Sequence, residues 1–169
     1  MVRIFVTLIE LFFCFLLQTS LFSLLRISGV VPNCLLILTV AVAYTRGQIP
    51  ALLTAFFAGL LLDLQFSETI GFCCVLYMLV AFLAGYTHRF YDKQDFLIPG
   101  ALVIAGEFVY SFLYYVIFFL LRGRLEFANY FVYTILPRIL YTTLLMLVLY
   151  PMFHGIHRLL LKLEGRDDD

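Results

Sequence analysis

The chain has 169 residues, of which 64% are hydrophobic and 13% charged, and its formal net charge at pH 7 is zero. Soluble domains carry roughly 25% charged residues, so this composition leaves too little polar surface to face water. It excludes a separate soluble domain. The absence of a basic patch that could follow a phosphate backbone also excludes nucleic-acid binding.

Six apolar runs, bounded by charged residues, prolines and glycines, predict transmembrane helices. A bilayer core of about 30 Å needs roughly 20 apolar residues per helix, so the chain has room for five or six spans with short connections. Pro32, Pro50 and Pro99 each stand at the start of a run, where a missing backbone N–H costs nothing. The predicted helices cover about residues 4–25, 32–45, 50–66, 70–87, 97–121 and 131–153.

These runs predict an all-α integral membrane protein, a six-helix transmembrane bundle with a single domain over residues 1–169. The first run lacks an Ala-x-Ala cleavage pattern and is interpreted as a retained helix, not a signal peptide. The second and third runs are short and only four residues apart, so we expect a tight hairpin of tilted or partly inserted helices. Residues 152–163 form a basic amphipathic stretch that we expect to lie along, or emerge from, the inner surface.

The distribution of Lys and Arg predicts that both termini lie in the cytoplasm. Cytoplasmic loops of membrane proteins carry an excess of these residues. With the N-terminus inside, seven fall on the cytoplasmic side, three fall outside, and Arg138 falls within a span. The inner seven are Arg3, Arg46, Arg89, Lys93, Arg158, Lys162 and Arg166, and the outer three are Arg26, Arg122 and Arg124.

Four ionisable residues lie inside predicted spans: Glu10, Asp63, Glu107 and Arg138. Each costs about 2.5 kcal/mol or more on insertion scales, so each is a candidate for a structural or partner-docking role.

Asp63 continues a line of small residues at four-residue spacing, Ala51, Ala55 and Gly59. Small residues permit close approach of helix backbones, so this line should face the bundle interior. Asp63 and Arg138 share a depth near the outer end of their helices, and we predict that they pair. The pair is either a structural clamp or part of a transport or docking site.

Two further carboxylates need a partner. Glu10 lies on the cytoplasmic side of its helix, where Arg46 ends the second helix, so a Glu10–Arg46 contact is expected unless Arg46 extends to the headgroups instead. Glu107 lies near mid-depth with no spare cation at that level. It is therefore either protonated or satisfied by another subunit or ligand. The aromatic residues crowding the same helix are core or lipid contacts, or a docking surface for another membrane protein.

Enzyme, metal and cofactor signatures are absent from the sequence. It contains no His-Glu-x-x-His, no Gly-x-Ser-x-Gly and no phosphate-binding glycine loop. His154 and His157 have a metal-compatible spacing but no third ligand, and we interpret them as interfacial histidines. The four cysteines lie in apolar runs without metal spacing and are interpreted as packing residues. We therefore predict a protein that is not an enzyme and holds no cofactor.

Part of the sequence resembles the bacterial rod shape-determining MreD family. The resemblance rests on Pro32-Asn33-Cys34-Leu35-Leu36-Ile37-Leu38, Arg46-Gly47, Ala58-Gly59-Leu60-Leu61-Leu62-Asp63-Leu64 and Gly71, and on total length. The later helices agree in size, in hydropathy and in the placement of Pro137 and Pro151. Asn33 departs from the acidic residue that the family often carries there, which puts in doubt any partner contact made by that acid.

The resemblance implies a non-enzymatic subunit of the cell-elongation machinery in the bacterial inner membrane. Its implied partners are an MreC-like single-span periplasmic scaffold, MreB, RodA and a class B penicillin-binding protein, in the setting of the lipid bilayer. It further implies a fold like the S-component of energy-coupling-factor transporters. The alternative function is accordingly a substrate-binding subunit of a vitamin transporter, which would need an outward-open pocket with unpaired polar groups.

Overall fold

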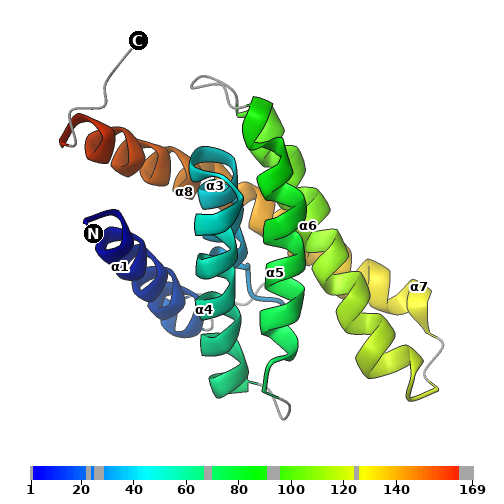
Figure 1. Cartoon of the computed structure of the whole chain (residues 1–169). Coiled ribbons are helices and arrows are strands. Elements are labelled where there is room, and N and C mark those ends of the chain that lie inside the picture. The colour runs from blue at the N-terminus through cyan, green and yellow to red at the C-terminus, as the bar shows by residue number, and fades with distance from the viewer. Residues whose placement is uncertain are drawn as a thin grey trace.

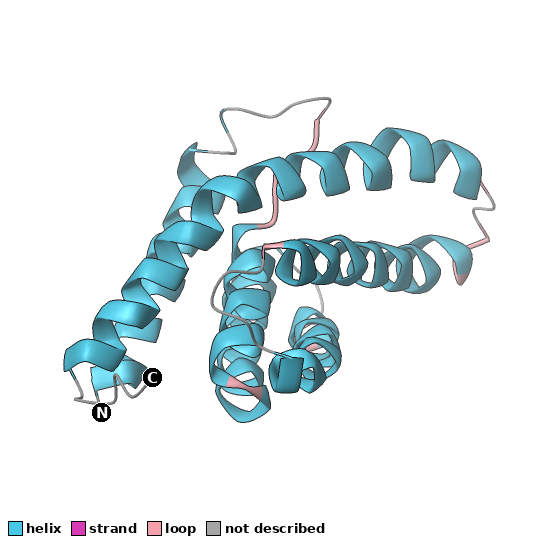
Figure 2. Cartoon of the chain, turned by 90° about the horizontal axis from the view of Figure 1, so that it is seen from above, coloured by secondary structure: helices cyan, strands magenta, loops and turns pink. Residues whose placement is uncertain are grey.

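The computed structural model describes residues 2–21, 24, 29–66, 70–90, 96–123 and 126–163. These residues form helices and loops (Figures 1 and 2), in agreement with the predicted all-α class. Seen from above, some helices point along the line of sight and others lie across it, so helices of the bundle cross one another at steep angles (Figure 2).

Six helical segments are described. The bounds are α1 Val2–Leu16 with η1 Leu17–Leu21, α3 Cys34–Arg46, α4 Gln48–Phe66, α5 Phe72–Gly85 with η2 Tyr86–Phe90, α6 Leu97–Tyr115 with η3 Val116–Leu120, and α7 Phe127–Tyr130 with η4 Phe131–Ile135 and α8 Leu136–Leu163. Five of these segments are long and apolar enough to cross a membrane. The exception is α3, a shorter apolar helix.

Helix α3 forms the core of the bundle. All of its residues from Cys34 to Thr45 are buried, and it packs against α1, α4, α5, α6 and α8. Its 13 residues span only about 20 Å, so it crosses roughly two thirds of a hydrocarbon core of about 30 Å. Its N-terminus therefore lies inside the bundle, where other protein groups must satisfy the first-turn N–H groups.

The connection between α3 and α4 is a single residue, Gly47. Its φ of +89° lies in the region that favours glycine, and a Cβ there would stand 3.3 Å from the His88 ring. The short connection holds α3 and α4 together, as predicted for the second and third runs. Pro50 lies in the first turn of α4 and Pro99 in the first turn of α6, as their placement in the sequence predicted.

Helices α4 and α5 form a closely packed antiparallel pair. A Cβ on Gly59 would stand 2.4 Å from the Cys74 Cα, and a Cβ on Gly85 would stand 2.8 Å from the Gln48 Cα. Ala51 and Ala55 are fully buried on the same side of α4. The predicted close-approach face of α4 is therefore confirmed, and α5 is the helix that packs on it.

The last helix is longer than the predicted 131–153. From Phe127 to Lys162 the helical stretch has 36 residues, or about 54 Å, so it extends beyond the membrane core. Pro151 lies inside α8 and does not end it. The predicted amphipathic stretch is thus the last part of α8, and it packs on the bundle through Phe153, His157 and Leu160.

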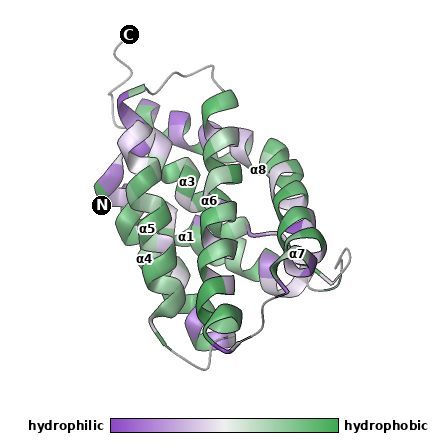
Figure 3. Cartoon of the chain, turned by 90° about the vertical axis from the view of Figure 1, so that its right-hand side faces the viewer, coloured by the Kyte–Doolittle hydropathy of each residue, from purple (hydrophilic) through white to green (hydrophobic). Residues whose placement is uncertain are grey.

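The outer surface of the bundle is apolar along the length of the helices. Large hydrophobic side chains such as Phe5, Phe12, Leu140 and Leu144 are exposed. Figure 3 shows hydrophobic residues over most of the helices and hydrophilic residues gathered toward their ends. This distribution is that of a protein whose solvent at mid-height is lipid.

Candidate functional site

The intramembrane charges other than Asp63 gather in two clusters. The Glu107 cluster, in the middle of the bundle, contains Glu107, Arg138, Asn33, Tyr77 and Tyr110. The Arg46 cluster, at the end where α3 stops and α1 starts, contains Arg46, Glu10, Thr7 and His157.

An ion pair between α6 and α8 forms the centre of the Glu107 cluster. The Arg138 Nε lies 2.7 Å from a Glu107 carboxylate oxygen, and the Glu107 side chain is 1% exposed. The guanidinium also lies over the Tyr110 ring, 5.1 Å from its centroid, a cation–π geometry. The prediction that no spare cation lies at the depth of Glu107 is wrong, because Arg138 reaches it from the last helix.

The predicted Asp63–Arg138 pair is wrong. The Asp63 carboxylate instead accepts hydrogen bonds from three backbone N–H groups at the start of α5: Gly71 at 2.9 Å, Cys73 at 3.0 Å and Cys74 at 3.3 Å. The first N–H groups of a helix have no partner within it and carry partial positive charge, so a carboxylate stabilises them. Asp63 is buried, as predicted, but it acts locally within the α4–α5 hairpin.

Asn33 was not predicted as a site residue, yet it links three helices. Its side-chain oxygen accepts hydrogen bonds from the Leu36 N–H at 3.2 Å and from the Tyr77 hydroxyl. Its own N–H donates to the Thr142 hydroxyl at 3.2 Å. Asn before an apolar run is a helix N-cap pattern, so the signal was present in the sequence. Because the side chain is fully buried, it lies inside the bundle and away from any partner surface.

The π-helical turn η1, which continues α1, supplies an acceptor for one more N–H group at the N-terminus of α3. The Gln18 side-chain oxygen accepts a hydrogen bond from the Leu35 N–H at 3.2 Å. Glu10, Cys14 and Gln18, which share a four-residue spacing, are all buried. The polar line on α1 therefore faces α3 and ties the two helices together.

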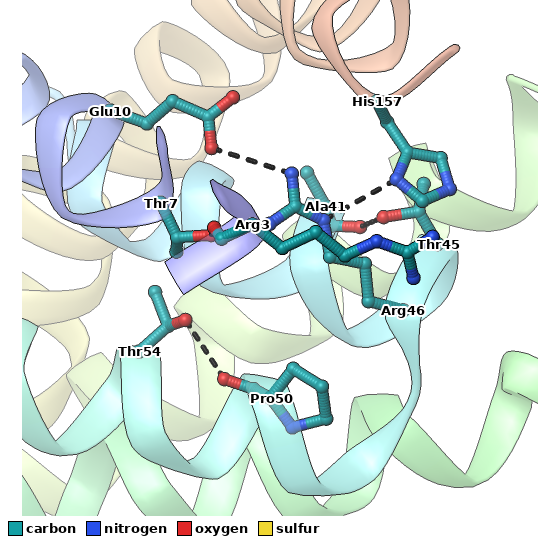
Figure 4. A network of polar contacts seen from close by, with 9 residues as sticks. All are labelled: Arg3, Thr7, Glu10, Ala41, Thr45, Arg46, Pro50, Thr54 and His157. Carbon is teal, nitrogen blue, oxygen red and sulfur yellow. Dashed lines mark hydrogen bonds and ion pairs between the residues drawn. The ribbon is translucent and has the colours of Figure 1, made fainter. Parts of the chain in front are cut away.

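The Arg46 cluster confirms the expected contact with Glu10. The Arg46 guanidinium lies 3.8 Å from the Glu10 carboxylate, and both side chains are less than 10% exposed. It also donates to the Thr7 hydroxyl and, at 3.3 Å, to the His157 Nδ1. Figure 4 shows these side chains converging from α1, α3 and α8. Arg46 thus fastens three helices at one end of the bundle instead of extending to the headgroups.

The aromatic residues of α6 are largely used within the chain. Tyr115 packs against Phe127 and Tyr130, with ring centroids 5.1 and 5.0 Å apart, and Phe119 packs against Tyr130 at 5.0 Å. Phe118 meets Phe72 of α5 at 4.9 Å. These contacts hold the C-terminal end of α6, with η3, to its neighbours, so these aromatic side chains serve packing within the chain.

In the described part of the chain, no group of three or more His, Cys, Asp and Glu side chains could hold a metal ion. The four cysteines are buried thiols that take part in no disulfide, as expected of packing residues. Each candidate site residue instead joins helices: Glu107 and Arg138 join α6 to α8, Arg46 and Glu10 join α3 to α1, and Asp63 and Gly59 join α4 to α5.

Comparison with known proteins finds one family. The family model of the rod shape-determining protein MreD matches residues 1–160 of the chain. No curated protein and no solved structure matches the chain.

Proposed function

The chain belongs to the MreD family of rod shape-determining proteins, and from this premise we propose that it is a scaffold subunit of the cell-elongation machinery. Members of this family are non-enzymatic membrane proteins that determine rod shape. The proposed role is to hold other membrane subunits together by helix–helix contacts while peptidoglycan is inserted along the lateral wall. The fold would be related to the S-component fold, as the family resemblance implies, although no solved structure supports this likeness.

One observation supports the scaffold role above the transporter alternative. Glu107, Arg138, Glu10, Arg46 and Asp63 are engaged by partners within the chain. A binding subunit for a polar vitamin would need such groups to be directed at a ligand, because buried polar groups must be hydrogen-bonded by something. Here helix pairing uses them, which is the expected arrangement in a rigid bundle that presents an apolar outer surface.

The proposed partner is an MreC-like protein with a single transmembrane helix; MreB, RodA and a class B penicillin-binding protein belong to the same proposed assembly. Co-expressed with the chain and extracted in mild detergent, the MreC-like protein is expected to co-purify at a fixed stoichiometry. The matched control replaces only its transmembrane helix with polyleucine, which keeps the membrane anchor and removes specific side chains. Association should be lost in that control.

Two results would contradict the scaffold proposal. Equal capture of the polyleucine version would show that no specific helix contact exists. Failure of the native pair to associate, together with stoichiometric capture of a small vitamin by the purified chain, would favour the transporter function.

We propose that both termini lie in the cytoplasm. The Arg46 cluster joins the start of α1 to the ends of α3 and α8, and the His88 Nδ1 lies 2.7 Å from the Tyr44 carbonyl oxygen, which brings the end of α5 to the same place. This end carries the described cations Arg3, Arg46, Arg89, Arg158 and Lys162, and an excess of cations favours the cytoplasmic side.

Cysteine labelling tests this orientation. In a variant whose native cysteines are replaced by alanine, Lys162→Cys should react with a membrane-impermeant maleimide only in inverted vesicles. Arg122→Cys, beyond the opposite end of α6, should react only in right-side-out spheroplasts. The reverse labelling pattern would overturn the orientation.

A further inference from the structure

A groove of about 410 Å³ opens between α1 and α4 at the end of the bundle that holds the Arg46 cluster. Its walls are apolar side chains that recur at helical spacing on the two facing surfaces: Ile4, Leu8 and Leu11 on α1, and Ile49, Leu53 and Phe57 on α4. Several of these side chains are exposed, including Leu53 at 56%. In a membrane this groove is open to lipid from the side.

The charged part of the groove is confined to one end. Arg3 and Arg46 line it there. The hydroxyls of Thr7 and Thr54 bond back to carbonyl oxygens of their own helices, Arg3 at 2.7 Å and Pro50 at 2.8 Å. The arginines therefore supply the charge of the groove (Figure 4). Glu10 pairs with Arg46 but is not part of the lining. Together, Arg3, Arg46 and Glu10 carry one net positive charge.

The length of the groove matches one leaflet of a bilayer. From Arg3 to Leu11, and again from Ile49 to Phe57, the lining covers nine residues of helix, a length of about 12 Å. Half of a hydrocarbon core of about 30 Å is about 15 Å. The groove thus begins at the membrane surface, where its cations lie, and ends near the bilayer midplane.

We propose that the α1–α4 groove binds one phospholipid with an anionic headgroup, its phosphate beside Arg3 and Arg46 and an acyl chain along the apolar walls. Basic pockets between transmembrane helices on the cytoplasmic side suit such headgroups, and the cytoplasmic leaflet supplies anionic lipid. A partner's transmembrane helix fits less well, because it crosses both leaflets while the groove covers one and has cations at its mouth. The lipid would fill the space between two helices that the protein itself leaves partly apart.

Native mass spectrometry of the delipidated full chain in detergent tests the proposal. Phosphatidylglycerol, the anionic probe, should be retained as one copy per chain at least about fivefold better than phosphatidylcholine, the fold-change expected from about one favourable charge contact. Arg3→Gln should remove most of this preference. Leu53→Trp, which fills the groove, should reduce retention of both lipids.

Two control variants leave the groove intact. Arg89→Gln removes a cation at the same end, one that lies over the Tyr86 ring at 4.5 Å, and Leu144→Trp adds an indole at an exposed position of α8. Both should retain phosphatidylglycerol like the original chain. Cross-links from phosphatidylglycerol with a photoreactive acyl chain should map to α1 and α4.

Several outcomes would overturn the proposal. Equal retention of the two lipids, or unchanged retention in both groove variants with their thermal unfolding also unchanged, would show that no specific site exists. Inorganic phosphate that stabilises the chain as strongly as phosphatidylglycerol would indicate a free-anion site. Leu53→Trp that weakens capture of the MreC-like protein but not of phosphatidylglycerol would assign the groove to a partner helix.

Discussion

Arg138→Leu is expected to lower the free energy of unfolding by about 3–5 kcal/mol, the usual cost of leaving one member of a buried ion pair without its partner. Glu107 would lose the cation that now lies 2.7 Å away, in a site where its side chain is 1% exposed. Unfolding titrations in mixed micelles, with the folded fraction followed by tryptic digestion, would measure the loss. In cells that depend on this copy of the gene, the same variant should shift rods toward spheres.

A double-mutant cycle identifies the partner of Arg138. Glu107→Leu combined with Arg138→Leu should recover most of the lost stability, because replacing both members of a buried pair by apolar groups is often close to neutral. Asp63→Asn combined with Arg138→Leu should instead give additive losses, since Asp63 contacts the N-terminus of α5. Strong coupling of Arg138 to Asp63 and none to Glu107 would refute the structure at this point.

Gly59→Ala is expected to cost about 2 kcal/mol or more, and Gly59→Leu is expected to prevent folding. The added Cβ would stand 2.4 Å from the Cys74 Cα, so α4 and α5 would have to move apart, and overpacking of this kind costs about 1–3 kcal/mol or more. Lipid tails are as apolar as the side chains, so close packing is a main source of helix association in a membrane, and its loss is not offset by a hydrophobic gain.

Gly100→Ala is the matched control for Gly59. A Cβ at Gly100 meets nothing within 4 Å, and alanine favours a helix over glycine by about 1 kcal/mol. This variant should therefore be as stable as the original chain or slightly more stable. Equal effects of alanine at the two positions would show that the α4–α5 contact is not a tight one.

The charged residues differ in how far the sequence alone could identify their partners. Glu10 and Arg46 could be paired from the sequence because both lie near the same predicted membrane surface, where depth and side leave few alternatives. Arg138 was assigned to Asp63 because residue counts placed those two at one depth and Glu107 nearer mid-depth, and such counts do not include the angles at which helices cross. The packing of α8 against α6 places it at Glu107, while Asp63 accepts hydrogen bonds from the backbone at the start of α5.

The sequence by itself determined that this is a multi-pass membrane protein, where most of its helices lie, that the Gly59 face is a packing surface, and to which family it belongs. These properties depend on local composition, periodicity and motif spacing, which can be read along one chain. Only the tertiary structure decided that α3 is a short buried core helix, that Asn33 joins it to two neighbours, and that Arg138 pairs with Glu107. Those contacts depend on the angles and register at which distant helices cross, and these result from packing over the whole bundle.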